Sequence, residues 1–166
     1  MNRGKILVQT FKEGLLSPLA HDLELRLGRF EVDRDAQRVR ARFWPETLEV
    51  AGVMRDGRLD AQALTAAQRA EIVDNIRTKI LNTDQHPEIV FEGEASPSAS
   101  GHRLSGQLSV LGRRVDLELT LEERDGCYLG SVTLTPTKWG IKPFKAMLGT
   151  IKLQDRVVVR FEIEKD

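Results

Sequence analysis

Three side chains near the start of the chain are of the types that hydrolases use for nucleophilic catalysis. Ser17, His21 and Asp22 could supply a nucleophile, a base and a group that orients the base. Their spacing argues against that chemistry, because residues one and four positions apart on a segment that leads into a strand do not place the three groups in series. We therefore expect them to make turn and rim contacts, and we predict no catalytic residue.

The histidines and the cysteine are the remaining candidates for metal or thiol chemistry. His21, His86 and His102 are the three histidines, and none stands in a metal-ligand spacing such as His-x-x-x-His. Cys127 is the single cysteine, so no disulfide can form within the chain, and beside Tyr128 it is typical of a small, partly buried residue. The sequence predicts no metal site and no enzyme.

Charge argues against further classes of function. The chain has 25 Lys and Arg residues against 25 Asp and Glu residues, a formal net charge of +0 and a pI of about 6.9. We expect the one basic pair, Arg113 and Arg114, to lie in a turn, and the pair is typical of a solvated hairpin tip. We therefore expect no nucleic acid partner and no binding to an anionic surface.

The N-terminal segment lacks the pattern of a signal sequence. Its apolar run Ile6–Val8 is broken by Gln9, Lys12 and Glu13, so it is too short for a leader or a membrane span. We expect no integral membrane span and a cytoplasmic location, or a periplasmic one if a leader has been removed. The sequence leaves open whether the protein forms a homodimer.

The elements that must position these side chains are mostly strands. Apolar and polar residues alternate along much of the chain, as in antiparallel strands with one buried face. Gly28 falls within a long curved second strand, and Ser96–Gly101 has the composition of a loop. We predict one domain over residues 1–166, an all-β antiparallel barrel of about eight strands. Such an interior is either filled by side chains or wide enough for one small ligand.

One segment has helical periodicity instead. We predict a capping helix at about residues 65–81, with Thr65 and Gln68 as a capping box and an apolar stripe facing the mouth of the barrel. Pro87 then moves His86 out of the helical region, so a strand begins at once. His86 is therefore expected to be a polar rim residue with a structural role.

Four stretches resemble one known family. "ILNTDQHPEIVFEG" is similar to the helix-to-strand signature of the YceI-like family, lipocalin-like barrel proteins of bacteria. "AHDLELRLGRFEV", "LSGQLSVLGRRVDLELTL" and "TKWGIKPFKAMLGTIKLQDRVVVRFEIE" resemble further family segments in the same order, although Trp139 stands where the family often has Phe. The resemblance implies a lipocalin-like barrel that binds an isoprenoid lipid lengthwise in an apolar channel, without a metal.

We therefore predict a protein that binds, sequesters or transports an elongated apolar lipid, polyisoprenoid or quinone-like, and that needs no cofactor beyond such a bound lipid or quinone. The alternative is a closed-core barrel that acts as a structural or protein-interaction module. For Trp139 and Phe144, core anchoring and a role as a pocket gate are equally compatible with the pattern. The polar rim residues are His21 and His86. The predicted channel lining is Leu23, Leu25, Leu27, Val39, Phe43, Val73, Ile76, Ile80, Ile89, Phe91, Leu108, Val110, Leu117, Leu119, Trp139, Phe144, Val159 and Phe161.

Overall fold

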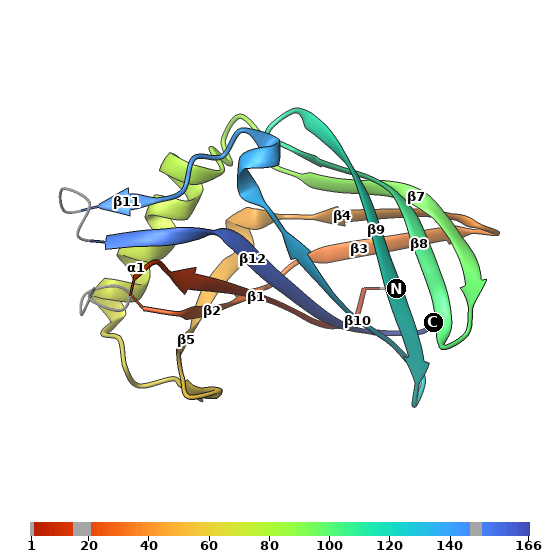
Figure 1. Cartoon of the computed structure of the whole chain (residues 1–166), viewed down its shortest axis with the longest axis horizontal. Coiled ribbons are helices and arrows are strands. Elements are labelled where there is room, and N and C mark those ends of the chain that lie inside the picture. The colour runs from red at the N-terminus through yellow and green to blue at the C-terminus, as the bar shows by residue number, and fades with distance from the viewer. Residues whose placement is uncertain (1, 15–20, 147–150) are drawn as a thin grey trace.

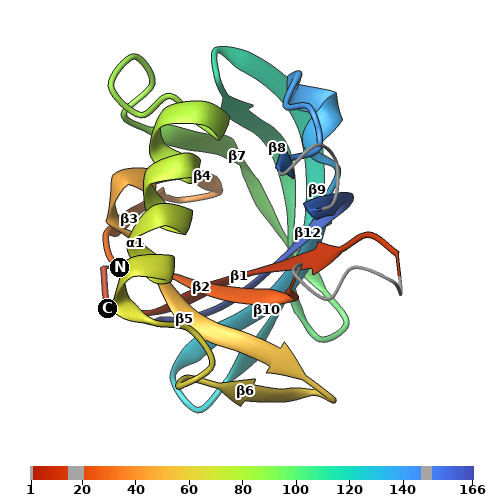
Figure 2. The same ribbon diagram turned by 90° about the vertical axis from the view of Figure 1, so that its left-hand side faces the viewer.

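The computed structural model describes residues 2–14, 21–146 and 151–166. These residues form one antiparallel sheet that curls round on itself (Figures 1 and 2), which confirms the predicted fold class. We call the end beside α1 the helix end. The opposite end, which carries the β3–β4 hairpin and both termini, is the far end (Figure 1).

The strand segments follow one path around the sheet. Their order is β3-β4-β7-β8-β9-β10-β12-β1-β2-β5-β6, and β11 pairs with β12 outside this path. The described residues form twelve segments, more than the predicted number of about eight, because β2 and β3 are two parts of one bent strand and β6 and β11 are very short. The segments are β1 (Gly4–Lys12), β2 (Leu23–Leu27), β3 (Phe30–Asp35), β4 (Arg38–Phe43), β5 (Leu48–Arg55), β6 (Arg58–Asp60), β7 (Ile89–Ser98), β8 (Gly101–Val110), β9 (Arg113–Arg124), β10 (Cys127–Leu134), β11 (Lys145–Ala146) and β12 (Ile151–Glu164).

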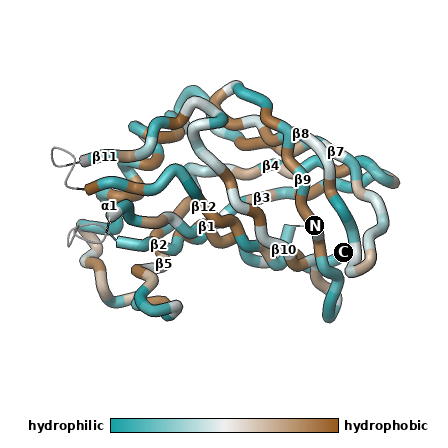
Figure 3. The backbone as a smooth tube through the Cα atoms, in the orientation of Figure 1, coloured by the Kyte–Doolittle hydropathy of each residue, from teal (hydrophilic) through white to brown (hydrophobic). Residues whose placement is uncertain are grey.

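Apolar and polar residues alternate along the strands (Figure 3). Successive side chains of a strand point to opposite faces of the sheet, so the apolar residues share one face. The buried side chains form two clusters, one around β2 and β5 and one around β7, β8 and β9. Phe43 and Phe161 are half-buried and pack against both clusters. The core is therefore a layer around the inside of the curled sheet.

The chain bends at Gly28, between β2 and β3, where the sequence predicted one long curved strand. The Gly28 N–H donates to the Thr47 carbonyl oxygen at 3.1 Å, and the Arg29 N–H donates to Thr47 Oγ1 at 2.9 Å. A Cβ on Gly28 would lie 3.1 Å from that carbonyl oxygen, so a larger residue would require Thr47 to shift by a few tenths of an ångström. Thr47 ends the short 3-10 helix η1 (Pro45–Thr47), which therefore fixes the corner after β4.

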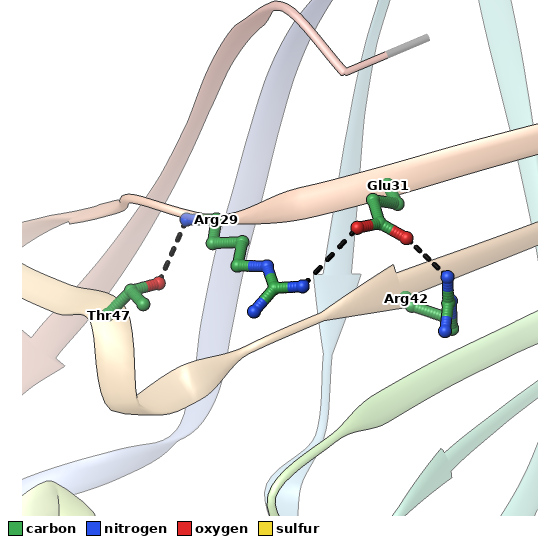
Figure 4. A network of polar contacts seen from close by, with 4 residues as sticks. All are labelled: Arg29, Glu31, Arg42 and Thr47. Carbon is green, nitrogen blue, oxygen red and sulfur yellow. Dashed lines mark hydrogen bonds and ion pairs between the residues drawn. The ribbon is translucent and has the colours of Figure 1, made fainter.

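An ionic network stabilises this corner from outside. The Glu31 carboxylate bridges the guanidinium groups of Arg29, at 3.4 Å, and of Arg42 (Figure 4). Both guanidinium groups also lie over the Trp44 ring, 3.9 Å and 5.4 Å from its centroid. The network joins β3 to β4 next to the bend, which supports the curvature of the sheet there.

The sheet is weakly paired at one seam. β9 and β10 pair only from Cys127↔Arg124 to Gly130↔Leu121. Beyond that last pair, β10 continues to Leu134 and β9 extends back to Arg113 without pairing with each other. The 3-10 helix η3 (Pro136–Trp139) lies near this seam, where Trp139 Nε1 donates to the Leu108 carbonyl oxygen at 2.8 Å. Trp139 is only 4% exposed and belongs to the second core cluster. It therefore serves as a core anchor.

The predicted helix is present but changes geometry near its end. α1 (Ala66–Asn75) begins with the predicted capping box, in which Thr65 and Gln68 satisfy each other's backbone N–H groups. Residues 76–80 form a π-helical turn, η2 (Ile76–Ile80), in place of a final α-helical turn. No helix among the described residues is long and apolar enough to span a membrane.

Arg69 fastens this helix to the sheet. Its Nη1 donates to the Val50 carbonyl oxygen on β5 at 2.9 Å, and its other nitrogens donate to the carbonyl oxygens of Ala61 and Leu64. Neither α1 nor η2 has a fully buried side chain. The helix is therefore held by this polar side chain together with partly buried apolar residues that pack against the first core cluster.

The predicted loop Ser96–Gly101 is wrong over most of its length. β7 continues to Ser98 and β8 begins at Gly101, so the turn is short. Pro97 is tolerated because β4 pairs with β7 only as far as Glu94, which leaves Pro97 with β8 as its single neighbouring strand.

Candidate functional site

The interior of the barrel holds an apolar cavity of about 240 Å³. Its walls come from the inner faces of the strands and from the corner at η1, so it extends between the helix end and the far end. Side chains therefore do not fill the barrel completely. The lining consists of Ile6, Val8, Leu27, Val32, Arg34, Val39, Ala41, Phe43, Pro45, Leu48, Ile89, Phe91, Ala95, His102, Leu104, Leu108, Val110, Leu117, Leu119, Leu121, Tyr128, Val132, Leu134, Val159, Phe161 and Ile163.

Most of the predicted channel residues surround this cavity. The structure brings together there Leu27, Val39, Phe43, Ile89, Phe91, Leu108, Val110, Leu117, Leu119, Val159 and Phe161. All of them belong to strands of the described sheet. Their contact with a ligand stays a prediction.

The other predicted channel residues lie away from the cavity. Leu23 and Leu25 are buried in the first core cluster, where they pack beside β5, and Val73 and Ile76 lie against the same cluster. The helix end is thus filled by side chains, and the helical stripe contacts this packing and not the cavity. The remaining members outside the lining are Ile80, Trp139 and Phe144.

The predicted rim residues lie apart from one another. His86 is half-buried at the helix exit, where its backbone N–H donates to the Asn82 carbonyl oxygen at 2.9 Å. Its ring approaches Gly112 in the β8–β9 turn. His21 lies two residues before the start of β2, while Ser17 lies outside the described residues.

Sequence analysis missed lining residues of two kinds. One kind continues the alternation of strands that were already recognised, as Ala41, Leu104 and Leu121 do, and a stricter count along each strand would have found it. Pro45 and Leu48 form the other kind, because they reach the cavity through the corner that η1 makes. No periodic pattern identifies such a corner.

Polar side chains line the cavity at the far end. Among the described lining residues only Arg34, His102 and Tyr128 are polar. Arg34 Nη1 donates to Tyr128 Oη at 3.3 Å, and the His102 ring packs edge-on against the Tyr128 ring with centroids 5.7 Å apart. The cavity is therefore an apolar channel, and three polar side chains stand at its far end, of which Arg34 is exposed to solvent.

Two side chains with a shifted pKa, Glu118 and Cys127, lie outside the cavity lining. The hydrogen bond and charge of Arg103 hold the pKa of the Glu118 carboxyl below its usual value. Burial raises the pKa of the Cys127 thiol, and the carboxylates of Glu162 and Glu164 add to the effect. A protonated thiol is a poor nucleophile, as expected for Cys127. The described residues hold no group of three or more potential metal-ligating side chains.

A family profile matches most of this barrel. The profile of the YceI-like domain covers residues 27–165, from the end of β2 to the residue after β12. The chain belongs to the YceI-like family. The family resemblance inferred from four short stretches is therefore confirmed, while this YceI-like chain matches no curated protein at a significant level.

Solved structures share the fold of this YceI-like protein at low sequence identity. It is similar to BcnA of Burkholderia cenocepacia with a TM-score of 0.63 and 12% identity, covering 98% of this chain and 96% of that chain. A polyisoprenoid-binding domain from Saccharophagus degradans, implicated in plant cell wall breakdown, gives a TM-score of 0.62 and 9% identity, covering 98% and 94%. The YceI protein of Campylobacter jejuni gives 0.51 and 7%, covering 86% and 84%.

Proposed function

We propose that this protein binds an elongated apolar lipid, polyisoprenoid or quinone-like, inside the barrel, and that it sequesters or transports this lipid without acting as an enzyme. The observation that carries the proposal is the apolar cavity of about 240 Å³. Membership of the YceI-like family supports it, as does the similarity to a domain described as polyisoprenoid-binding.

The cavity constrains the shape of the ligand. Its volume of about 240 Å³ is smaller than the roughly 300–1,000 Å³ of pockets for drug-sized molecules. A long chain therefore fits only when it is extended along the barrel and is one chain thick. Each methylene group buried there contributes up to about 0.8 kcal/mol, part of which offsets the entropy lost on ordering the chain.

A charge at the inner face of β9 tests this proposal. Leu119 lines the cavity opposite Leu104, whereas Glu118 points outward and its carboxylate lies 2.6 Å from Arg103 Nη2. We expect purified parent protein to show extra mass in native mass spectrometry that is lost on denaturation. Leu119→Glu should remove that mass because a carboxylate would be buried against an apolar chain. Glu118→Gln, the matched control, should retain it.

Two outcomes would contradict the proposal. Circular dichroism must first show that both variants are folded. If a folded Leu119→Glu carries as much lipid as the parent, the ligand does not occupy this cavity. If the parent carries no lipid and takes up no added farnesol, the closed-core alternative replaces the lipid-binding function. The cytoplasmic location and the oligomeric state stay predictions.

A further inference from the structure

The polar end of the cavity has a regular structural origin. Arg34 pairs with Val39, His102 with Leu121 and Tyr128 with Ile163. Directly opposed residues in an antiparallel pair point to the same face of the sheet, and all three partners line the cavity. Arg34, His102 and Tyr128 therefore occupy inward positions, each at the far end of an otherwise mostly apolar row.

Neighbouring charges at this end are largely satisfied by one another. Glu123 accepts from Lys165 and lies 3.2 Å from His102 Nε2. The Lys165 ammonium also lies 5.1 Å from the Tyr128 ring centroid. The negative charge of Glu123 is thus occupied by two partners, and it does not neutralise Arg34.

Arg34 and Tyr128 lie at the far end of the cavity, where Arg34 is exposed to solvent and both side chains keep hydrogen-bond donors. Arg34 donates through Nε to the Ala36 carbonyl oxygen at 3.0 Å and through Nη1 to Tyr128 Oη. No ion pair joins Arg34 to a carboxylate of the described residues. Tyr128 accepts from Arg34, so its own hydroxyl proton can be donated to a further acceptor. A guanidinium and a hydroxyl that adjoin an apolar channel form a site for an anionic oxygen.

We propose that the ligand is a single-chain amphiphile with an anionic oxygen head, and that Arg34 and Tyr128 bind this head at the far end while the chain extends toward the helix end. This inference rests on the proposed lipid-binding function and adds the polarity and the direction of the ligand. His102 supports the Tyr128 ring through its edge contact. Arg34 has an alternative role, which is to close the far end of the barrel without contacting a ligand. That role predicts no preference for an anionic ligand, so a binding experiment separates the two roles.

The test compares two ligands that differ only in the head. Dodecanoate and dodecan-1-ol each displace the neutral fluorescent probe N-phenyl-1-naphthylamine from the full chain. We expect the parent to bind dodecanoate roughly five- to tenfold more tightly, since a charge-assisted hydrogen bond at a partly exposed site contributes about that much. Arg34→Gln should abolish this preference, because it should weaken the binding of dodecanoate far more than the binding of dodecan-1-ol. Tyr128→Phe should reduce the preference.

Arg38→Gln is the matched control. Arg38 lies in the same β3–β4 hairpin, opposite Asp35, and is exposed on the outer face, so its replacement changes the net charge by the same amount without changing the cavity. This variant should keep the preference for dodecanoate.

Four results would overturn the inference. Equal binding of the two ligands by the parent, or a preference that survives in Arg34→Gln, refutes the head site and leaves lipid binding intact. Loss of affinity for both ligands in folded Arg34→Gln would show that Arg34 only closes the barrel. Failure of the parent to bind the probe and both ligands would refute the proposed lipid binding, and the head site with it.

Discussion

Glu118 is the residue whose ionisation depends most plainly on a single partner. Arg103 lowers the pKa of its carboxyl, so the folded state holds the charged form more strongly than the unfolded chain does. The stabilisation is therefore present above the unfolded value of about 4.5 and is lost as the pH falls through the lowered folded value. The pair is exposed and its contribution is small.

The lowered pKa of Glu118 predicts that the difference in thermal stability between the parent and Glu118→Gln depends on pH. Glu118→Gln should unfold at a slightly lower temperature than the parent at pH 7, and the difference should disappear near pH 2. Thermal melts followed by circular dichroism at both pH values measure it. A difference that is the same at both pH values would show that the carboxylate charge is not its cause.

Single residues also show where sequence analysis was sufficient and where it was not. Leu117 and Leu119 were placed at the cavity because alternation assigns each strand position to one face. Arg34 follows Phe30 and Val32 in the same alternating row, but a polar side chain at the end of a row resembles the start of a turn. The distinction depends on the partner strand, whose register the sequence does not specify.

Arg69 connects the capping helix to the rest of the barrel. Arg69 donates to three carbonyl oxygens, one of them on β5. Arg69→Met keeps the apolar stem but leaves those acceptors without this donor, which should lower the free energy of unfolding by roughly 1–3 kcal/mol. Denaturant titration measures the change, and Arg77→Met, at an exposed position in η2, is the control. Equal stability of the two variants would contradict the anchoring role.

Two glycines permit the close approach of β7 and β8. Gly93 and Gly106 are directly paired, and a Cβ on Gly106 would lie 2.2 Å from the Glu92 carbonyl oxygen and 2.5 Å from Gly93 Cα. Because both contacts are with backbone atoms, Gly106→Ala should destabilise the fold by about 2 kcal/mol or more. Ser105→Ala, at the neighbouring outward position, should change stability far less. A neutral Gly106→Ala would show that the strands can separate at little cost.

Local signals predicted the start of the helix better than its end. The Thr65 and Gln68 capping box is a contact between neighbours in the sequence, so the sequence alone identifies it. The π-helical turn at Ile76–Ile80 and the anchoring by Arg69 depend on packing against the barrel. Tertiary contacts of that kind produce no periodic pattern in the sequence. For that reason the sequence predicted one continuous helix.

For the whole molecule, the fold class was predictable and the filling of the interior was not. Alternation and one capping helix predicted an antiparallel barrel, and the structure and the family both confirm it. The same inward side chains could have met in the centre of the barrel and filled its interior. Whether they do depends on the curvature set at the Gly28 bend and on the seam between β9 and β10, which the alternation cannot specify.

The pairing of the first strand with the last also constrains how the protein folds during synthesis. β1 is paired on one side with β12, from Gly4↔Ile163 to Lys12↔Leu153, so the earliest strand must wait for nearly the whole chain before that edge is covered. Contacts between segments so far apart in sequence make folding slow. Until β12 leaves the ribosome, the apolar row that includes Ile6 and Val8 stays uncovered along that edge, and the nascent chain is most prone to aggregation during that interval.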